Sequence, residues 1–203
     1  MAVSPIILED LVANNLQNDI LHALKYDTAW NYIDGTSAPD AVVDQNDYKI
    51  KDNPQMVHYI INEHIVESHM AELVAPLCLA IEEKLKIKIE HVVRVKSNML
   101  LRDSGSTDFY HVPHVDGADE DWLSVIYYAE DSDGDTIIFD KTVEQGPFNL
   151  SAVKTITPKQ GKAIAFPSKI FHTSQSPVTN NTRIIINLIL KLSQGSNAVE
   201  LCS

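Results

Sequence analysis

The spacing of apolar residues divides the chain into a helical part and a β-rich part. Over residues 7–25, apolar side chains from Leu8 to Leu24 recur at intervals of three and four, which predicts an amphipathic helix. Residues 66–85 repeat this spacing and predict a second helix. Pro76 lies inside this second helix and should kink or split it, because proline has no backbone N–H to donate.

Beyond these helices the pattern changes to short apolar runs separated by turn residues. The polar residues 26–54 should form loops with one short strand near residues 30–33. After residue 88 the runs predict eight strands: Ile89–Leu101, Phe109–Val115, Trp122–Ala129, Thr136–Asp140, Phe148–Ile156, Lys162–Phe166, Ile170–Ser174 and Arg183–Leu192. Short strands at regular intervals are typical of a sandwich or barrel.

The predicted fold is therefore α+β with a mainly β core, a jelly roll with N-terminal packing helices. All 203 residues should form a single domain. Its expected parts are a helical support region at 1–87, the β core at 88–193 and a tail at 194–203.

Charge and composition narrow the range of partners. The formal net charge is −12, and no run of Lys and Arg offers a basic patch, which argues against nucleic acid as a partner. Two cysteines argue against a disulfide framework. No apolar run reaches the length of a membrane helix, and Met1–Pro5 lacks the basic segment of a signal peptide. A cytoplasmic protein without a membrane partner is expected; its oligomeric state stays open.

The segment Phe109–Gly117 carries the main chemical signal. In an extended strand, residues two apart point to the same side, so His114 and Asp116 should project together. His172, on a later predicted strand, is the proposed third ligand, because a jelly roll brings distant strands together. Two histidines and one carboxylate that leave open positions are typical of non-haem iron(II) oxygenases.

Arg183 adds a second signal at the start of the most apolar predicted strand. A guanidinium at the mouth of an apolar barrel needs an anionic partner, and its planar fork matches a carboxylate. A small carboxylate ligand is one such partner. An ion pair with one of the chain's own Asp or Glu side chains is the alternative.

The order of several segments resembles the 2-oxoglutarate and Fe(II)-dependent oxygenases, especially their prolyl 4-hydroxylase-like branch. The resemblance covers roughly residues 90–192 and implies a double-stranded β-helix core. It rests on His114–Asp116, Val125–Tyr128, Asp133–Phe139, Thr157–Pro167, His172 and Arg183.

The resemblance also implies roles for single residues. His114, Asp116 and His172 would bind Fe(II). Arg183 would pair with the distal carboxylate of 2-oxoglutarate, and Tyr128 corresponds to a tyrosine that donates to the same carboxylate. The implied reaction consumes 2-oxoglutarate and O2 and hydroxylates a substrate. The branch further implies binding of L-ascorbic acid.

Two further residues are expected near the co-substrate. Strand parity puts Tyr110 on the side of the metal ligands, where it should line the mouth of the site, and Asn98 should face the co-substrate from the preceding strand. The chain departs from the family at Ile185, where some relatives carry Ser or Thr, and at residues 101–104, where the hydroxylase branch usually has a tyrosine.

Several alternatives remain at this stage. A nucleic-acid demethylase of the same superfamily would need a basic groove. A non-catalytic jelly-roll module and an unrelated metal-binding cupin are the other two. The substrate, a peptidyl proline or a small molecule such as a free amino acid, is open. Asp116 favours hydroxylation, because halogenases of this family lack that carboxylate.

Overall fold

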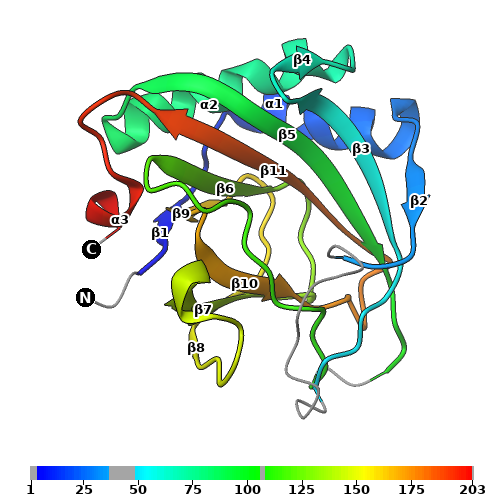
Figure 1. The fold of residues 1–203 in the computed structure, drawn as a ribbon. Helices are drawn as coiled ribbons and strands as arrows, with labels where there is room; N and C mark the ends of the chain where they lie inside the picture. The colour runs from blue at the N-terminus through cyan, green and yellow to red at the C-terminus, as the bar shows by residue number, and fades with distance from the viewer. Residues whose placement is uncertain (1–3, 37–48, 106–107, 203) are drawn as a thin grey trace.

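The structure is a computed structural model that describes residues 4–36, 49–105 and 108–202. Its centre is a large antiparallel sheet and a smaller one facing it (Figure 1). In spatial order, the large sheet contains β1 (Ile6–Leu8), β9 (Ala163–Pro167), β6 (Trp122–Tyr128), β11 (Thr182–Leu192), β5 (Ile89–Leu101), β3 (Gln55–Asn62) and β2 (Asn31–Ile33), with β4 (Ile65–Val66) paired to β3. The small sheet has the order β10 (Ile170–Ser174), β7 (Thr136–Thr142) and β8 (Ala152–Ile156).

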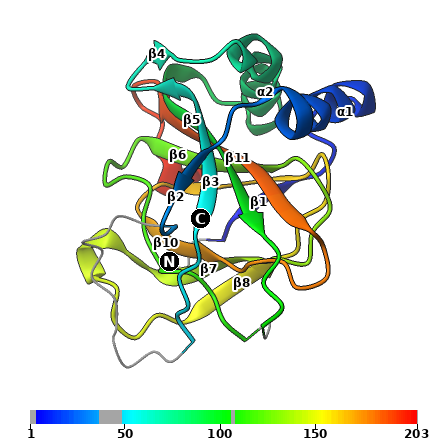
Figure 2. The same cartoon turned by 90° about the vertical axis from the view of Figure 1, so that its right-hand side faces the viewer.

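The longer helices cover the outer face of the large sheet. Figure 2 shows α1 (Asn14–His22) and α2 (Met70–Leu85) on one side of this sheet, with β7, β8 and β10 on the other. A π-helical turn, η1 (Ala23–Asp27), extends α1, and the short η2 (Val143–Gln145) and α3 (Ala198–Leu201) complete the elements. The predicted mainly β jelly roll with N-terminal packing helices is confirmed.

The alternation of β11 explains how one strand serves two layers. Its even positions from Ile184 to Leu190 are buried in the cluster that includes Ile20, Met70 and Leu77 of the helices. Its odd positions Arg183, Ile185 and Asn187 point the other way and line a cavity between the sheets. Neighbouring side chains of a strand point to opposite faces, so the helices bury one face and the site uses the other.

Most predicted strands after residue 88 are confirmed, and two of them, β5 and β10, have the predicted bounds. The strand expected at Phe109–Val115 is wrong: this segment is irregular, with single bridges from Tyr110 to Ile50 and from His114 to His172. Pro113 and the backbone hydrogen bonds of this segment to residues 49–51 and to β10 replace a regular ladder.

The N-terminal part differs more from expectation. The first helix starts at Asn14, because Ile6–Leu8 pairs with β9 as β1. The second helix starts at Met70 and is not split by Pro76, since its buried face packs against the sheet. Residues 55–62 form β3, a strand that the sequence pattern did not predict. Among the described residues, no helix is long and apolar enough to cross a bilayer.

Candidate metal and co-substrate site

Three side chains offer metal-binding atoms at one point between the two sheets. The ligand atoms of His114, Asp116 and His172 all lie within 4.8 Å of one another. His172 belongs to β10, and His114 is fixed beside it by two backbone hydrogen bonds of 3.0 and 2.9 Å. The backbone N–H of Asp116 donates to the carbonyl of Ser168 at 2.9 Å. Backbone hydrogen bonds to His172 and Ser168 therefore position the segment of His114 and Asp116, although this segment is not itself a strand.

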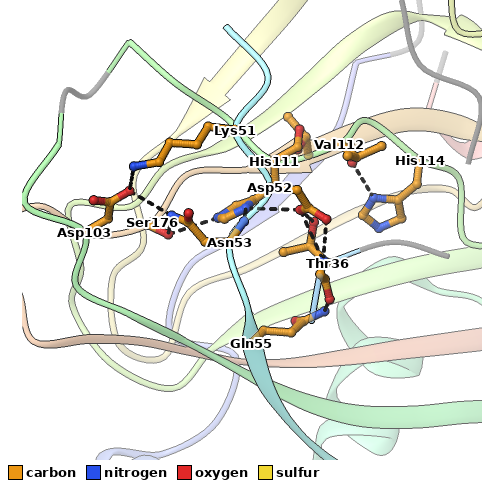
Figure 3. Close-up of polar contacts among 12 residues, drawn as sticks. Thr36, Lys51, Asp52, Asn53, Gln55, Asp103, His111, Val112, His114 and Ser176 are labelled. Atoms are coloured by element: carbon orange, nitrogen blue, oxygen red, sulfur yellow. Dashed lines mark hydrogen bonds and ion pairs between the residues drawn. The ribbon is translucent and has the colours of Figure 1, made fainter. Parts of the chain in front are cut away.

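Both imidazoles are oriented in the same way. Nδ1 of His114 lies 3.1 Å from the carbonyl oxygen of Val112 (Figure 3), and Nδ1 of His172 lies 3.1 Å from that of Ile170. A carbonyl only accepts, so each Nδ1 carries the proton and each Nε2 has its lone pair available for a metal. Nε2 of His172 lies 3.6 Å from Oδ2 of Asp116.

Asp116 is held by three polar neighbours in a buried position. Its side chain is 1% exposed. Arg94 donates to Oδ1 at 2.9 Å, Ser124 to Oδ2 at 2.8 Å, and the amide of Asn187 to both oxygens at 3.1 and 3.2 Å. A carboxylate with this many donors is fixed in orientation and keeps its charge.

The protonation states suit a metal cation. Burial and the neighbouring His172 lower the pKa of His114 to about 4, so its ring is neutral near pH 7. Burial alone would raise the pKa of Asp116, but His172, Arg94, His114 and Ser124 together hold it below the usual carboxyl value. Two histidine rings with Nε2 directed to one point and one carboxylate fit the facial ligand set of non-haem iron(II), so the residues present fit this metal.

A cavity of about 660 Å³ opens from the three ligands and leads to Arg183. Arg183 is only 3% exposed. It donates from Nε to the carbonyl of Gly134 and from Nη2 to Oγ1 of Thr136, both at 2.7 Å. Among the described residues no carboxylate forms an ion pair with it, so the alternative of an internal ion pair finds no support there. Burial lowers the pKa of Arg183 although Asp135 opposes the shift, yet arginine stays charged and has no carboxylate at ion-pair distance among the described residues.

Gly134 allows the chain to pass close to Arg183. A Cβ at this position would lie 2.5 Å from the carbonyl oxygen of Gln175 and 3.0 Å from Cδ of Arg183. A larger residue would therefore displace the guanidinium or the loop at Gln175. Glycine at this position therefore has a packing reason, the close approach of the two chain segments.

Thr136, and not Tyr128, presents the hydroxyl group to the cavity. Tyr128 is fully buried, and its hydroxyl donates to Oγ1 of Thr136 at 2.9 Å. The same Oγ1 accepts from Arg183, so the proton of the Thr136 hydroxyl is available to a ligand. Thr136 lines the cavity while Tyr128 lies behind it, which corrects the expectation that Tyr128 reaches the co-substrate directly.

The structure places the two remaining candidates, Asn98 and Tyr110, differently relative to the cavity. Asn98 lines the cavity, as expected, and donates to Oε1 of Gln55 at 2.6 Å. Tyr110 is not among the residues that line the cavity; its ring packs on Phe139 with the centroids 5.9 Å apart. The expectation for Tyr110 was wrong because strand parity holds only where the backbone is regularly extended.

Sequence reasoning missed Lys96, Arg94, Asn187, Ser124 and Thr136. A usable signal existed for three of them. Arg94, Lys96 and Asn98 alternate along β5, so one face of a largely apolar strand is polar. Asn187 has the parity of Arg183 on β11. The contact of Ser124 with Asp116 depends on sheet pairing and has no local signal.

A second polar network, the rim network, joins loops around a separate small pocket (Figure 3). Lys51 and Asn53 both donate to Asp103, at 2.5 and 2.8 Å. Asn53 also donates to Ser176 and, through its backbone, to His111. These contacts join three loops that are far apart in the sequence.

Comparison of the sequence with protein-family models and with curated proteins gives no match. Solved structures do match. An oxidoreductase of the 2OG-Fe(II) oxygenase family from Burkholderia pseudomallei has a TM-score of 0.62 at 14% identity, covering 98% of this chain and 89% of that one. A prolyl hydroxylase from Trichoplax adhaerens in complex with a hypoxia-inducible factor peptide fragment has a TM-score of 0.57 at 12% identity, covering 92% and 83%.

HygX from Streptomyces hygroscopicus, solved with nickel and 2-oxoglutarate bound, has a TM-score of 0.58 at 9% identity, covering 97% of this chain and 85% of that one. At these identities the likeness shows the fold. The chain has the double-stranded β-helix architecture of 2-oxoglutarate and Fe(II)-dependent oxygenases, and its candidate metal site lies between the two sheets of that architecture.

Proposed function

We propose that this protein is a 2-oxoglutarate-dependent Fe(II) dioxygenase. The observation that carries the proposal is one cavity with a two-histidine, one-carboxylate ligand set and, leading from it, a buried arginine without a carboxylate partner among the described residues. A metal-binding cupin of other chemistry would need the ligands but would have no use for Arg183. Similarity to solved oxygenases, one with 2-oxoglutarate bound, supports the same reaction class.

In this proposal His114, Asp116 and His172 hold Fe(II), and Arg183 holds the distal carboxylate of 2-oxoglutarate. The hydroxyl of Thr136 would donate to that carboxylate as well. When bound, the iron would supply the redox chemistry that couples decarboxylation of 2-oxoglutarate to oxidation of the substrate. The apolar walls at Ile126 and Ile185 would exclude water from the reaction.

The overall reaction would be hydroxylation. One atom of O2 enters the substrate C–H bond, and the other enters succinate as 2-oxoglutarate loses CO2. Asp116 occupies one metal position, which favours this outcome over halide transfer. The substrate is a peptide or a small molecule, and the cavity residues that hold neither the metal nor 2-oxoglutarate would select between them. Binding of L-ascorbic acid and a cytoplasmic location stay predictions.

An anaerobic spectrum tests this proposal. Fe(II) and 2-oxoglutarate added to the purified protein should produce a visible metal-to-ligand charge-transfer band. The band should disappear in His172→Ala, and Arg183→Ala should require much more 2-oxoglutarate to produce it. His91→Ala and Arg102→Ala, which change exposed residues outside the cavity, are the matched controls.

Admission of O2 should then release succinate. Iron bound without a charge-transfer band would rule out 2-oxoglutarate and leave a metal-binding cupin. If no iron binds at all, the better interpretation is a non-catalytic module of the same fold.

A further inference from the structure

The cavity contains one cation that neither the metal ligands nor the co-substrate uses. Its charged lining residues besides the histidines are Arg94, Lys96, Arg183 and Asp116. Arg94 is paired with Asp116. Arg183 is assigned to 2-oxoglutarate in the proposed function. Lys96 forms no ion pair or hydrogen bond with any residue that the structure describes. Its Nζ lies 6.0 Å from the centroid of the Tyr59 ring.

The position of Lys96 places it near the metal ligands and away from Arg183. On the paired strands β5 and β11, Lys96 lies opposite Asn187, whose amide contacts Asp116. Arg183 lies opposite Leu100, four residues further along β5. At roughly 3.3 Å per residue, the backbone positions of the two cations are about 13 Å apart along the sheet, which places Lys96 toward the metal ligands and away from the guanidinium of Arg183.

A lysine in this setting requires an anion. Burial and the neighbouring Arg94 lower the pKa of Lys96 to about 8, although Asp116 opposes the shift. The ammonium is therefore mostly charged near pH 7 in a half-buried side chain. A charge without a partner is costly in such a place, and a bound carboxylate would satisfy it.

Asn98, beside Lys96 on the same face of β5, presents an acceptor. The carbonyl of Gly35 only accepts, so Nε2 of Gln55 donates to it at 3.0 Å, and Oε1 of Gln55 accepts from Asn98. These two successive hydrogen bonds fix the orientation of the side-chain amide of Asn98. Its Oδ1 is buried and has no hydrogen-bond partner among the described residues. A ligand with an N–H or O–H group would satisfy it.

We infer that Lys96 and Asn98 form a substrate subsite for a small molecule that carries a carboxylate beside an N–H donor, the chemistry of a free α-amino acid. The inference rests on the proposed function and narrows its substrate class from peptide or small molecule to a free acid. The carboxylate binds Lys96 and the amino group donates to Oδ1 of Asn98. A peptidyl residue within a chain lacks the carboxylate.

Titration calorimetry with the twenty standard L-amino acids and their carboxamides tests the subsite. It is done with the protein alone and with Fe(II) and 2-oxoglutarate under anaerobic conditions. At least one acid should bind about tenfold or more tightly than its carboxamide, as expected for loss of a charged hydrogen bond. Lys96→Met should remove this difference, and Lys96→Arg should retain most of it. Lys154→Met, which changes an exposed lysine on β8, is the control.

The charge-transfer band separates this inference from the proposed function. Lys96→Met should change the apparent affinity for 2-oxoglutarate by no more than about twofold, because the two sites are far apart. A loss as large as that of Arg183→Ala would mean that Lys96 holds the co-substrate, and would overturn the inference. So would carboxamides that bind as well as acids, or a wild-type protein that forms the band but binds no amino acid. Absence of the band in the wild type would instead defeat the proposed function.

Discussion

The network around Asp116 at the cavity floor and the rim network around Asp103 are both centred on a carboxylate, yet they differ in what they leave unpaired. At the floor, Asp116 is 1% exposed and accepts from three side chains. At the rim, the Asp103 side chain is 27% exposed and accepts from Lys51 and Asn53. The donors at the floor, Arg94, Ser124 and Asn187, lie on strands, whereas the rim network joins loops.

Among the described residues, four buried side-chain atoms have no hydrogen-bond partner, and none belongs to the rim network; three belong to cavity side chains and the fourth is the hydroxyl of Tyr127. Nε of Arg94, Oδ1 of Asn98 and Oδ1 of Asn187 are such atoms, and all three side chains line the cavity. Each costs free energy in the absence of a ligand. A network that satisfies its own groups stabilises loops, and a network that leaves groups unpaired toward a cavity is built for a ligand.

Removal of the floor carboxylate should have the largest effect. Asp116→Ala deletes a metal ligand and leaves Arg94 without its partner, so the bound metal should fall to a trace. The metal-free protein should lose about 3 kcal/mol of unfolding free energy, the typical cost of breaking a buried pair. Metal analysis and urea denaturation measure both. Asp131→Ala, at an exposed pair with Lys159, should change neither by much. Retention of stoichiometric metal by Asp116→Ala would refute the ligand set.

Loss of an orienting hydroxyl should have a smaller effect. Ser124→Ala removes the donor to Oδ2 of Asp116 and should weaken Fe(II) binding about tenfold, as for other groups that orient metal ligands. Ser97→Ala is the matched control, because its buried hydroxyl donates to the carbonyl of Ile185 instead. Equal Fe(II) affinities for the two variants, measured by competition with a chelator, would show that Ser124 does not act through Asp116.

Two substitutions test which hydroxyl serves the co-substrate. Thr136→Val removes the group that lines the cavity and should weaken 2-oxoglutarate binding about tenfold, the range for a hydrogen bond to a charged group. Tyr128→Phe removes only a hydrogen bond to the far side of Thr136 and should weaken 2-oxoglutarate binding about threefold or less. Titration of the charge-transfer band compares them. The reverse order would restore the direct role expected for Tyr128.

A substitution in the rim network should change the unfolding free energy in a pH-dependent way and leave metal binding unchanged. The Lys51 ammonium and the Asn53 amide hold the pKa of Asp103 at about 2, below its ordinary value of 3.8. This stabilisation is present above pH 4 and is lost as the pH falls through about 2. Asp103→Asn should cost about 1 kcal/mol at pH 7, allowing for solvent screening, and less toward pH 2. Urea unfolding against pH measures it; a cost that does not depend on pH would contradict the ion pair.

The strands and the candidate ligands were predictable because their signals are local. The apolar runs of β5 and β10 give their bounds, and His114, Asp116, His172 and Arg183 stand out as polar residues in or beside such runs. The structure brings all four to one cavity. Their roles as metal and co-substrate ligands remain proposals that the spectra above test.

The failures occurred where the outcome depends on distant parts of the chain. Tyr110 was misplaced because its segment is fixed by bridges to Ile50 and by contacts of His114 with His172, not by its own alternation. Tyr128 lies behind Thr136, an arrangement that the sequence did not indicate, because β6 and β7 belong to different sheets. Neither pairing is visible in the local pattern.

The sequence by itself therefore determined the class of fold and the residue types available for metal and anion binding, because periodicity and composition are local properties. Only the tertiary structure decided which polar groups meet. Lys96 is an ordinary strand lysine in the sequence. It becomes a candidate substrate ligand because sheet pairing places it half-buried in the cavity wall near Asp116, without an ion pair among the described residues. Burial and the lack of a partner are properties of the fold, and they carry the functional information here.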